Sequence, residues 1–399
     1  MNGMTGNSAK SLDGRIRVLR IAHASLTPSL RERERALVNE CPDIDLQVVT
    51  TKRWEEAGVD VCVTPDDLFP VTGGRALLSK HIQLFAYDPR PLITALRHHR
   101  PHLIDLNHEP YSVACAEVLA LRDWMMPRVP VVMQVAQNID RQYPPPFNWL
   151  QQRALRKVAA AYACNESARE LLRARGFDGP VSIIPFGVNT RVFAPSPKTE
   201  SANDALTIGF VGRMLPGKGL NVLANALSHI ASLNWKLLLV GDGPERAAFE
   251  AKLATYQLLD RSRFTGAVSY QEIPELFHQM DLFIMPTRTT GRIREQFGRV
   301  LVEAMASGVP VVGTTCGAIP DVMGSAGLVV TENDAQALAG AIRQLLTNAD
   351  LRTRLAISGR QHVEQNYSWE LVARKTYDLF QQVLRERAVT KLTEVEAAA

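Results

Sequence analysis

The stretch "IGFVGRMLPGKGLNVL", residues 208–223, runs from an apolar segment through a glycine-rich turn into a second apolar pattern. It predicts a strand–turn–helix unit, in which backbone N–H groups at the helix start can face an anion. Residues 212–218 fit the phosphate-loop pattern G-x-x-x-x-G-K, but Gly219 stands where a Ser or Thr hydroxyl would bind Mg²⁺. Two interpretations follow: a phosphate site that needs no metal, or a plain turn with two solvated cations, Arg213 and Lys218.

The composition of the chain is that of a folded protein with more than one domain. Its 399 residues exceed one ordinary core, and 46% are hydrophobic while 22% are charged. The five cysteines form no C-x-x-C pair, which indicates reduced thiols and a cytoplasmic protein. Neither a secretory signal nor a membrane span is expected, and the net charge of +4 makes no case for nucleic acid.

Short apolar runs alternate with helical patterns along the chain, which predicts βαβ units and an α/β fold with parallel sheets. In the first half the expected strands are residues 16–22, 45–50, 102–107, 130–136 and 181–186, and the expected helices are 90–100, 112–124 and 148–160. In the second half the expected strands are 206–212, 235–241, 281–286, 309–314 and 327–330, with helices from Leu220, over 244–254 and over 297–308. Three helical stretches close the chain.

A change of composition separates two Rossmann-like domains. We expect a disordered start at 1–14, a first domain at 15–185 plus about 370–388, and a linker at 186–204 rich in Pro, Ser, Thr and Asn. The second domain is expected at 205–369 and a disordered tail at 389–399. Two such domains leave a cleft between them, where ligands usually bind.

Two glutamates mark a second candidate site. Glu295 and Glu303 lie eight residues apart in "REQFGRVLVEAMASGVPVVG", residues 294–313. If a helix begins near Phe297, Glu295 lies in the loop before it and the N–H groups of Phe297 and Gly298 can face an oxyanion. A buried Glu303 would need a partner such as a ligand hydroxyl pair. The alternatives are a charge at the helix start for Glu295, and a solvated face or an i,i+4 pair with Arg299 for Glu303.

Weaker signals accompany these two. "GDGPER", residues 241–246, is a fragment of a dinucleotide fingerprint with Arg246 in place of the last glycine, and a tight turn explains it as well. The D-x-D of Asp43–Asp45 and the histidines of "HHRPH", residues 98–102, give little support to a metal site. His108 follows an expected strand at the carboxyl end where ligands bind.

Together these residues resemble the nucleotide-sugar glycosyltransferases of the GT-B fold, family 4, the retaining hexosyltransferases of the "glycosyl transferases group 1" type. The resemblance rests on "GFVGRMLPGKG", "LLLVGDGPE", "FTGAVSYQEIPELFHQMDLFIMPT" and "EQFGRVLVEAMASGVPVVGTTCGAIPDV", which contains the E-x₇-E pair. It covers nearly all of residues 185–385. The first half is similar through "LNHEPYS" and "QNIDRQYPPPF" to transferases of bacterial cell-surface polysaccharides. The final helix resembles the family's segment that crosses back to the first domain.

The resemblance implies a role for each matching residue. Arg213 and Lys218 would hold the donor diphosphate, beside Gly212 and the amides of Phe297 and Gly298. Glu303 would bind the ribose hydroxyls and Glu295 the sugar hydroxyls. The turn at Gly266–Val268 would meet the base. Arg213, Lys218 and Glu295 are thus the expected catalytic residues, with no metal or other cofactor.

One departure from the family concerns the first domain. Many relatives carry a histidine near residues 131–139, where this chain has Gln134 and Gln137. An amide cannot act as a general base. This favours a retaining route in which the leaving phosphate takes the acceptor proton. Gln137 and His108 remain candidates on the acceptor side.

The resulting expectation is a retaining, metal-independent hexosyltransferase. It would move a sugar from a UDP-, GDP- or ADP-sugar to a glycan, lipid-linked or small-molecule acceptor, in cell-surface polysaccharide or glycoconjugate synthesis. The enzyme would be cytoplasmic, with contact to the inner face of the cell membrane through basic helices. The alternatives are an epimerase or hydrolase on the same scaffold, a catalytically silent sugar-nucleotide-binding protein, and a Rossmann dehydrogenase.

Overall fold

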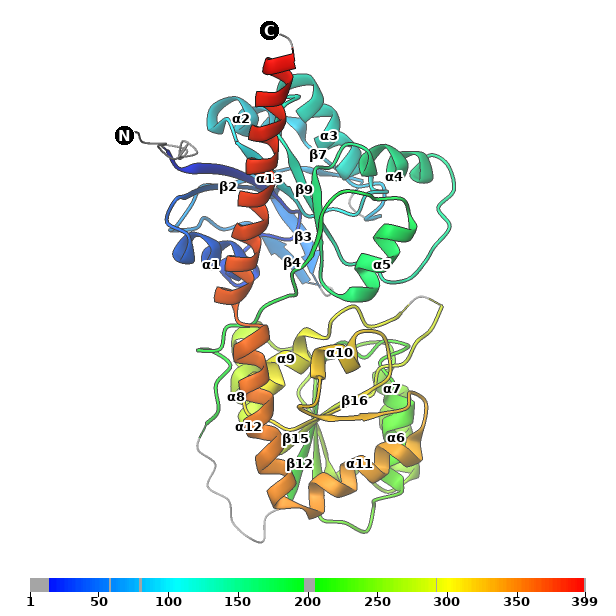
Figure 1. The fold of residues 1–399 in the computed structure, drawn as a ribbon. Helices are drawn as coiled ribbons and strands as arrows, with labels where there is room; N and C mark the ends of the chain where they lie inside the picture. Colours follow the sequence, from blue (N-terminus) through cyan, green and yellow to red (C-terminus); the bar gives the residue numbers. More distant parts are fainter. Residues whose placement is uncertain (1–13, 57–58, 79–80, 197–204, 292, 398–399) are drawn as a thin grey trace, which may run out of the picture. The chain divides into compact units, whose positions relative to one another are not determined.

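Two parallel sheets form the framework of the chain (Figure 1). The computed structural model describes residues 14–56, 59–78, 81–196, 205–291 and 293–397. The first sheet has the order β11-β10-β9-β8-β1-β2-β5, and the strands from β9 to β5 pair in parallel. Its strands are β1 (Ile16–Ile21), β2 (Ile44–Thr51), β5 (Val71–Gly74), β8 (Leu103–Leu106), β9 (Val131–Val135), β10 (Ala160–Ala163) and β11 (Val181–Ile183).

Three of the five helices of this first series begin at a capping side chain. Asp88, Ser112 and Asn165 each accept a hydrogen bond from a backbone N–H in the first turn of the helix that follows. The helices are α1 (Glu32–Glu40), α2 (Pro89–His99), α3 (Val113–Met125), α4 (Phe147–Leu155) and α5 (Glu166–Ala174). Two small antiparallel pairs, which the sequence analysis did not predict, are β3 (Arg53–Glu56) with β4 (Val59–Cys62) and β6 (Ala76–Leu77) with β7 (Ala86–Tyr87).

The predicted strands are confirmed, but β5 and β10 of the first sheet and the strand at Ser262–Phe264 of the second were missed, and one helix was expected to be too long. The helix expected over 148–160 ends at Leu155, and the chain then enters β10. The four residues of β10 are all buried in the sheet. Alanine has a low preference for strands, so the sequence "AAYA" carries no local strand signal, and burial within the sheet decides its conformation.

The second sheet is entirely parallel, with the order β14-β13-β12-β15-β16-β17. Its strands are β12 (Leu206–Val211), β13 (Trp235–Val240), β14 (Ser262–Phe264), β15 (Leu282–Met285), β16 (Val311–Thr314) and β17 (Leu328–Val330). Successive strand residues alternate between two buried clusters: Leu282 and Ile284 join one, Phe283 and Met285 the other. Because both faces are covered, the strands read as continuous apolar runs.

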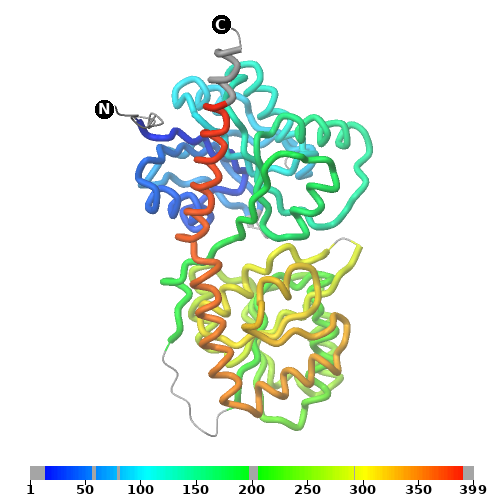
Figure 2. Tube along the Cα trace, in the orientation of Figure 1, coloured from blue at the N-terminus to red at the C-terminus, as the bar shows by residue number. Residues whose placement is uncertain are grey.

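Helices cover both faces of this sheet (Figure 1). They are α6 (Leu220–Ser228), α7 (Arg246–Thr255), α8 (Ile273–His278), α9 (Arg299–Ala306), α10 (Ile319–Met323), α11 (Ala335–Thr347) and α12 (Ala349–Asn366). The long helix α13 (Trp369–Ala397) follows, so three helices close the described chain as predicted (Figure 2). The tail expected to be disordered from residue 389 is therefore helical as far as Ala397.

Contacts divide the chain into two compact units. Unit 1 contains residues 1–134, 144–161 and 376–399, and unit 2 contains 135–143 and 162–375. This division assigns residues 162–185 to unit 2, whereas the sequence prediction placed them in the first domain. Helix α13 contributes residues to both units, as the resemblance implied for the final helix.

Two predicted irregular segments fall partly outside the described residues. Residues 1–13 of the expected disordered start lie outside them, as do residues 197–204 of the expected linker. In the described part of that linker, Val188 and Phe193 are buried in the core of unit 2. Val188 also forms a bridge with Ser368.

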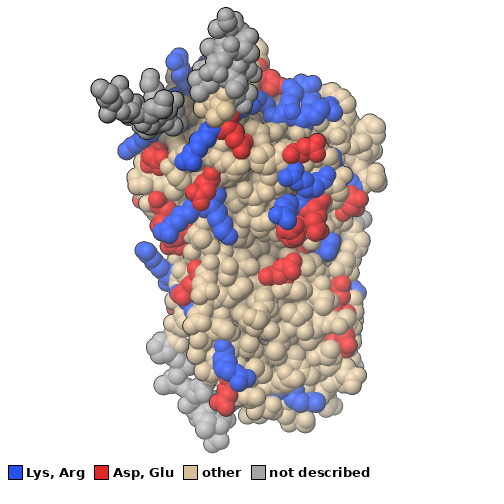
Figure 3. All heavy atoms as spheres, in the orientation of Figure 1, with Lys and Arg blue, Asp and Glu red and all other residues tan. Residues whose placement is uncertain are grey.

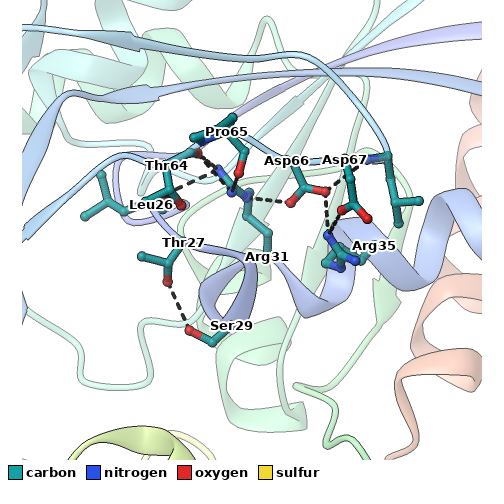
Figure 4. A network of polar contacts seen from close by, with 10 residues as sticks. Leu26, Thr27, Ser29, Arg31, Arg35, Thr64, Pro65, Asp66 and Asp67 are labelled. Atoms are coloured by element: carbon teal, nitrogen blue, oxygen red, sulfur yellow. Dashed lines mark hydrogen bonds and ion pairs between the residues drawn. The ribbon is translucent and has the colours of Figure 1, made fainter.

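Buried arginines organise the start of α1 in unit 1. The Arg31 side chain is fully buried, and its guanidinium donates to the Thr64 and Pro65 carbonyls and to Asp66 (Figure 4). Arg35 pairs with the same carboxylate and with Asp67. These contacts fix the loop before β5 against α1, so Arg31 and Arg35 have a structural role and are not simply solvated charges on the helix surface.

Charges on the surface are mixed. Figure 3 shows basic and acidic side chains interspersed over the visible face of unit 1. Among the described residues, no helix is both long and apolar enough to cross a membrane.

Candidate functional site

The strand order of unit 2 places a binding site at one position. Strands β12 and β15 are neighbours. The sheet continues from β12 to β13 and β14 on one side and from β15 to β16 and β17 on the other, so the strand order reverses between β12 and β15. Ligands of open α/β sheets bind beyond the carboxyl ends of the strands at such a switch point. The loop after β12, residues 212–219, and the loop after β15, residues 286–298, flank this position.

The packing of the glycine-rich turn explains why residue 219 is not the Ser or Thr of the phosphate-loop pattern. Gly219 is the N-cap of α6 with a φ of 75°, a left-handed conformation that favours glycine. A Cβ at this position would overlap the carbonyl oxygen of Pro286. Ser or Thr therefore cannot occupy residue 219 without moving the loop after β15. The departure from the phosphate-loop pattern is thus a requirement of the close approach between the two loops.

The two cations of this turn differ in their surroundings. Lys218 Nζ lies 2.8 Å from Glu295 Oε2, and both side chains are largely buried. Arg213 is exposed, and its side chain makes no hydrogen bond or ion pair with any described residue. The structure thus brings Lys218 and Glu295 together and leaves the Arg213 guanidinium available to a ligand.

The helix after Glu295 begins later than expected. Helix α9 starts at Arg299 with Gly298 as its N-cap, whereas the sequence analysis placed the start near Phe297. The reason is the left-handed φ of 86° at Gly298, which turns the chain into the helix. Within the described part of the chain, neither the Phe297 nor the Gly298 N–H group donates a hydrogen bond. Phe297 itself is buried, so its ring anchors the turn in the core.

Glu303 is a buried carboxylate with partners on its own unit. Its side chain is 6% exposed, and Oε1 accepts a 3.0 Å hydrogen bond from the Tyr270 hydroxyl. Arg299 lies 3.8 Å from the same oxygen, so the i,i+4 pair considered from the sequence is present. Arg299 also lies over the Tyr270 ring. The sequence analysis did not single out Tyr270, whose hydroxyl orients this carboxylate.

The turns after β13 and β14 lie against each other. Gly241 donates to the Gly266 carbonyl at 2.9 Å. Arg246 pairs with Asp242 and Glu250, and its guanidinium lies over the Phe264 ring. Arg246, which replaces the last glycine of the dinucleotide fingerprint, therefore supports the Gly266–Val268 turn from the side. Val268 is partly buried against the core of unit 2.

The two glutamines have different positions. Gln137 lines a pocket with Lys218 and Glu295 in unit 2. Gln134 is buried, and its Oε1 accepts a 2.8 Å hydrogen bond from Arg20 in unit 1. The amide oxygen of Gln134 is therefore held in the interior by the Arg20 guanidinium, away from the position of Gln137.

His108 is buried in unit 1 at the reversal of the first sheet, between β1 and β8. Its Nε2 lies 2.8 Å from the Tyr87 hydroxyl, and burial moves its pKa well below the ordinary value. The sequence analysis overlooked His23. Its ring centroid lies 5.2 Å from that of His108, and burial lowers its pKa to about 4. Both rings are therefore neutral near pH 7. No motif marks His23, because only the adjacency of β1 and β8 brings it here.

The weak metal signals have structural explanations. Asp43 of the D-x-D accepts a 2.5 Å hydrogen bond from Tyr377. In "HHRPH", His99 contacts the Val18 carbonyl and His102 accepts from the Arg17 N–H. In the part of the chain that the structure describes, no three His, Cys, Asp or Glu side chains form a group that could hold a metal ion.

Two family models match this chain. Residues 205–348 match the model described as glycosyl transferases group 1, and residues 30–192 match the model described as glycosyltransferase family 4. The two matched ranges include the loops after β12 and β15 in the second sheet and His108 in the first.

Curated relatives are similar over about half of the chain. A GDP-mannose-dependent monoacylated alpha-(1-6)-phosphatidylinositol monomannoside mannosyltransferase from Corynebacterium glutamicum is 29% identical over 247 residues, which cover 57% of this chain and 64% of the relative. A D-inositol 3-phosphate glycosyltransferase from Stackebrandtia nassauensis is 29% identical over 53% of this chain and 50% of the relative. The chain thus spans about half to under two thirds of these proteins.

Solved structures are similar over nearly the whole chain. A glycosyltransferase from Rickettsia africae superposes with a TM-score of 0.72 at 18% identity, covering 93% of this chain and 99% of the other. Anabaena HepE, solved in complex with UDP, gives 0.71 at 17% identity over 92% and 100%. At this level of identity the likeness concerns the fold, and it confirms the predicted pair of Rossmann-like domains.

Proposed function

This chain belongs to the family 4 glycosyltransferases and has their GT-B fold, and we propose that it is a retaining hexosyltransferase that uses a nucleoside-diphosphate sugar. The observation that carries the proposal is the Lys218–Glu295 ion pair at the reversal of the second sheet. It places a cation and a hydroxyl-binding carboxylate side by side, close in sequence to the N–H groups of Phe297 and Gly298. A diphosphate joined to a sugar needs this combination.

The donor site is built along the carboxyl edge of the second sheet. Arg213 and Lys218 bind the diphosphate, together with the backbone at Gly212 and the N–H groups of Phe297 and Gly298. Glu303 accepts the ribose hydroxyls, and the Gly266–Val268 turn meets the base. Charge develops on the leaving diphosphate in the transition state, and donors fixed before the reaction stabilise it most. Because these cations and N–H groups stabilise the diphosphate charge, the proposed reaction needs no metal ion.

The acceptor proton leaves without a base from the protein. Gln137 lines the pocket beside Lys218 and Glu295, and its amide cannot take a proton near pH 7. His108 is buried and hydrogen-bonded to Tyr87. The leaving phosphate oxygen therefore takes the proton on the face from which it departs, and an α-linked donor gives an α-linked product.

The acceptor belongs to cell-surface glycan or glycoconjugate synthesis. The names of the curated relatives include phosphatidylinositol mannosides and inositol 3-phosphate as substrates, which supports a lipid-linked or small polar acceptor. A cytoplasmic enzyme working at the membrane surface fits such an acceptor. The structure contains only free cysteines, at residues 41, 62, 115, 164 and 316, as a reducing compartment allows.

A thermal-shift screen with UDP-, GDP- and ADP-sugars, followed by product analysis, tests the proposal. A donor at 100 times its Kd should add about 2.7 kcal/mol of stability. Products formed only with an acceptor identify a transferase, whereas products formed without one identify an epimerase or hydrolase. Binding without turnover over a panel of acceptors would identify a silent binding protein. Stabilisation by none of the sugar nucleotides would reject the donor site.

A further inference from the structure

The backbone at Glu295 is held by side chains that lie far from it in the sequence. Asn138 Nδ2 donates to the Glu295 carbonyl at 2.8 Å. Asn165 Nδ2 donates to the carbonyl of the next residue, Gln296, and Cys164 Sγ donates to the same oxygen at 3.7 Å. All of these residues belong to unit 2. The peptide that carries the Glu295 carboxylate is therefore fixed by two asparagine amides.

The loop after β16 holds the same carbonyl from another segment. The Ala318 N–H donates to the Glu295 carbonyl at 3.0 Å. Gly317 has a left-handed φ of 59°, and a Cβ at this position would lie 2.1 Å from the Glu295 carbonyl oxygen. Lys218 pairs with the carboxylate itself at 2.8 Å. The protein thus holds both the backbone and the side chain of Glu295.

Asn138 is not needed to satisfy the Glu295 carbonyl. That carbonyl already accepts from Ala318, and the Asn138 side chain leaves its own Oδ1 buried without a hydrogen-bond partner among the described residues. Asn138 is 3% exposed. A buried acceptor without a partner lowers stability, and an apolar side chain of the same shape would avoid this cost. The placement of the Glu295 loop therefore explains an asparagine here better than stability does.

The loop that carries Asn138 is itself fixed on unit 2. Gln137 Nε2 donates to the Tyr143 hydroxyl at 3.2 Å. Arg294 donates from Nη1 to the Asn138 carbonyl at 3.3 Å, while Asn138 donates to the next residue, Glu295. Because each of the two loops donates to the other, the position of the Glu295 loop depends on Asn138.

We propose that Asn138 and Asn165 are positioning residues for Glu295. Their amides hold the backbone of its loop so that the carboxylate meets the transferred sugar beside Lys218. This inference rests on the proposed function, because Glu295 contacts the sugar only in that proposal. A displacement of about 1 Å in a group that orients the substrate can lower the rate by about 10²-fold. The two asparagines therefore act on kcat through Glu295, without touching the substrate.

Asn138→Leu and Asn165→Asp test the proposal by steady-state kinetics. Asn138→Leu keeps the shape and removes both the donor and the unpartnered oxygen, so kcat should fall by roughly tenfold or more while stability to urea stays equal or rises. Asn165→Asp keeps the oxygen that accepts from the Ala168 N–H at the start of α5 and loses the donor to Gln296, so kcat should also fall. Asn348→Leu, which removes an exposed asparagine at the start of α12, should keep the wild-type kcat.

A double variant shows whether Asn138 acts through Glu295. In a Glu295→Ala background the carboxylate is absent, so Asn138→Leu should lower kcat by less than about twofold. A loss of the same size in both backgrounds would show that Asn138 affects the enzyme elsewhere, and would overturn the proposal. A wild-type kcat in folded Asn138→Leu or Asn165→Asp would overturn it for that residue.

Hydrogen exchange separates this proposal from the proposed function. If the wild type neither binds nor turns over a sugar nucleotide, the proposed function fails, and exchange of the Ala318 N–H still reports how firmly the Glu295 loop is held. Loss of one hydrogen bond should speed this exchange by about fivefold in Asn138→Leu and in Asn165→Asp, and Asn348→Leu should leave it unaltered. Faster exchange would keep the two asparagines as positioning residues of Glu295. Unaltered exchange in both variants would overturn the proposal.

Discussion

Lys218 Nζ and Glu295 Oε2 lie 2.8 Å apart, joining the turn after β12 to the loop after β15. The two residues are 77 positions apart in sequence, and the parallel pairing of β12 with β15 brings their loops together. In the proposed reaction the lysine faces the leaving diphosphate and the carboxylate faces the sugar. The pair therefore stands at the bond that breaks.

Replacement of Lys218 should slow the chemical step. Lys218→Ala removes a fixed cation from the leaving group, and the loss of one such donor typically lowers kcat by roughly 10²–10³-fold. Steady-state kinetics with a saturating donor measure the change. Lys236→Ala, which removes an exposed lysine on β13, should leave kcat unaltered.

A substitution of Arg213 provides a second test of the positive charge in the turn after β12. Arg213→Lys keeps the charge but loses the planar fork of donors, so it should also lower kcat. A near-normal kcat of Lys218→Ala would mean that the turn after β12 has only a structural role, irrespective of the result for Arg213→Lys.

The two glutamates should differ in kinetic effect. Glu303→Ala removes a ribose contact present in both the ground and the transition state, so it should mainly raise the donor KM. Glu295→Ala removes the sugar contact and the partner of Lys218, so it should mainly lower kcat. Initial-rate measurements over a range of donor concentrations separate the two parameters.

Tyr270→Phe is the matched control for Glu303. It removes the hydroxyl that donates to Glu303 at 3.0 Å and keeps the ring beneath Arg299. A rise in donor KM smaller than that of Glu303→Ala is expected, because the carboxylate remains but is less well oriented. Opposite effects of the two glutamate variants would exchange their roles, and no effect of either would make the pair structural.

Chelation should leave turnover intact. The proposed leaving-group stabilisation comes from Arg213, Lys218 and backbone N–H groups, and none of these needs a metal ion. Rates measured in EDTA should therefore equal rates measured in Mg²⁺ or Mn²⁺. Activity that vanishes in EDTA and returns with the metal would contradict the diphosphate site as proposed.

Acid should destabilise the protein through its buried histidines. The pKa of His23 falls from 6.5 to about 4 on folding because the ring is buried, and burial moves the pKa of His108 in the same direction. The unfolded chain therefore binds more protons than the folded chain between these values. His23 alone should lower the free energy of unfolding by about 2 kcal/mol between about pH 7 and about pH 5.

Urea unfolding at the two pH values measures this loss. The contribution is complete above the unfolded pKa, declines as the pH falls below it, and levels off below about pH 4. His23→Phe should show a smaller loss than wild type, because the phenyl ring cannot bind a proton. Equal pH dependence in the two proteins would mean that His23 has the same pKa in the folded and unfolded states.

The sequence predicted more of the candidate site in unit 2 than of the polar residues in unit 1, for a physical reason. Gly219 and Lys218 lie in one short turn, where local geometry decides which residues fit, so a motif records them. The parallel sheets followed from βαβ alternation. Glu303 was identified, but its partner Tyr270 lies 33 residues away and only packing joins them.

Unit 1 carries its polar residues on separate strands. Gln134 is bound by Arg20, 114 residues earlier, and His23 meets His108 only because β1 and β8 pair. No local pattern encodes such pairs. The alanine-rich strand β10 was missed for a similar reason, since the neighbouring strands and not its own residues set its conformation.

The last prediction concerns the stereochemistry of transfer. An inverting enzyme needs a base opposite the leaving group, whereas same-face transfer can use the leaving phosphate oxygen. Gln137 cannot take a proton, and His108 is buried with Tyr87 on its Nε2. An α-linked donor should therefore give an α-linked product. The anomeric proton in the NMR spectrum of the product decides this, and a β-linkage would refute the retaining route.

The same argument predicts no catalytic titration from His108. A protein base gives an acidic limb in the pH–rate profile that disappears with the residue. Wild type and His108→Gln should therefore show the same profile, even if the variant is less stable because the Tyr87 contact is changed. Circular dichroism confirms that each protein is folded at every pH used. Loss of an acidic limb in a folded His108→Gln enzyme would make His108 the base, and the leaving phosphate would then no longer be needed as proton acceptor.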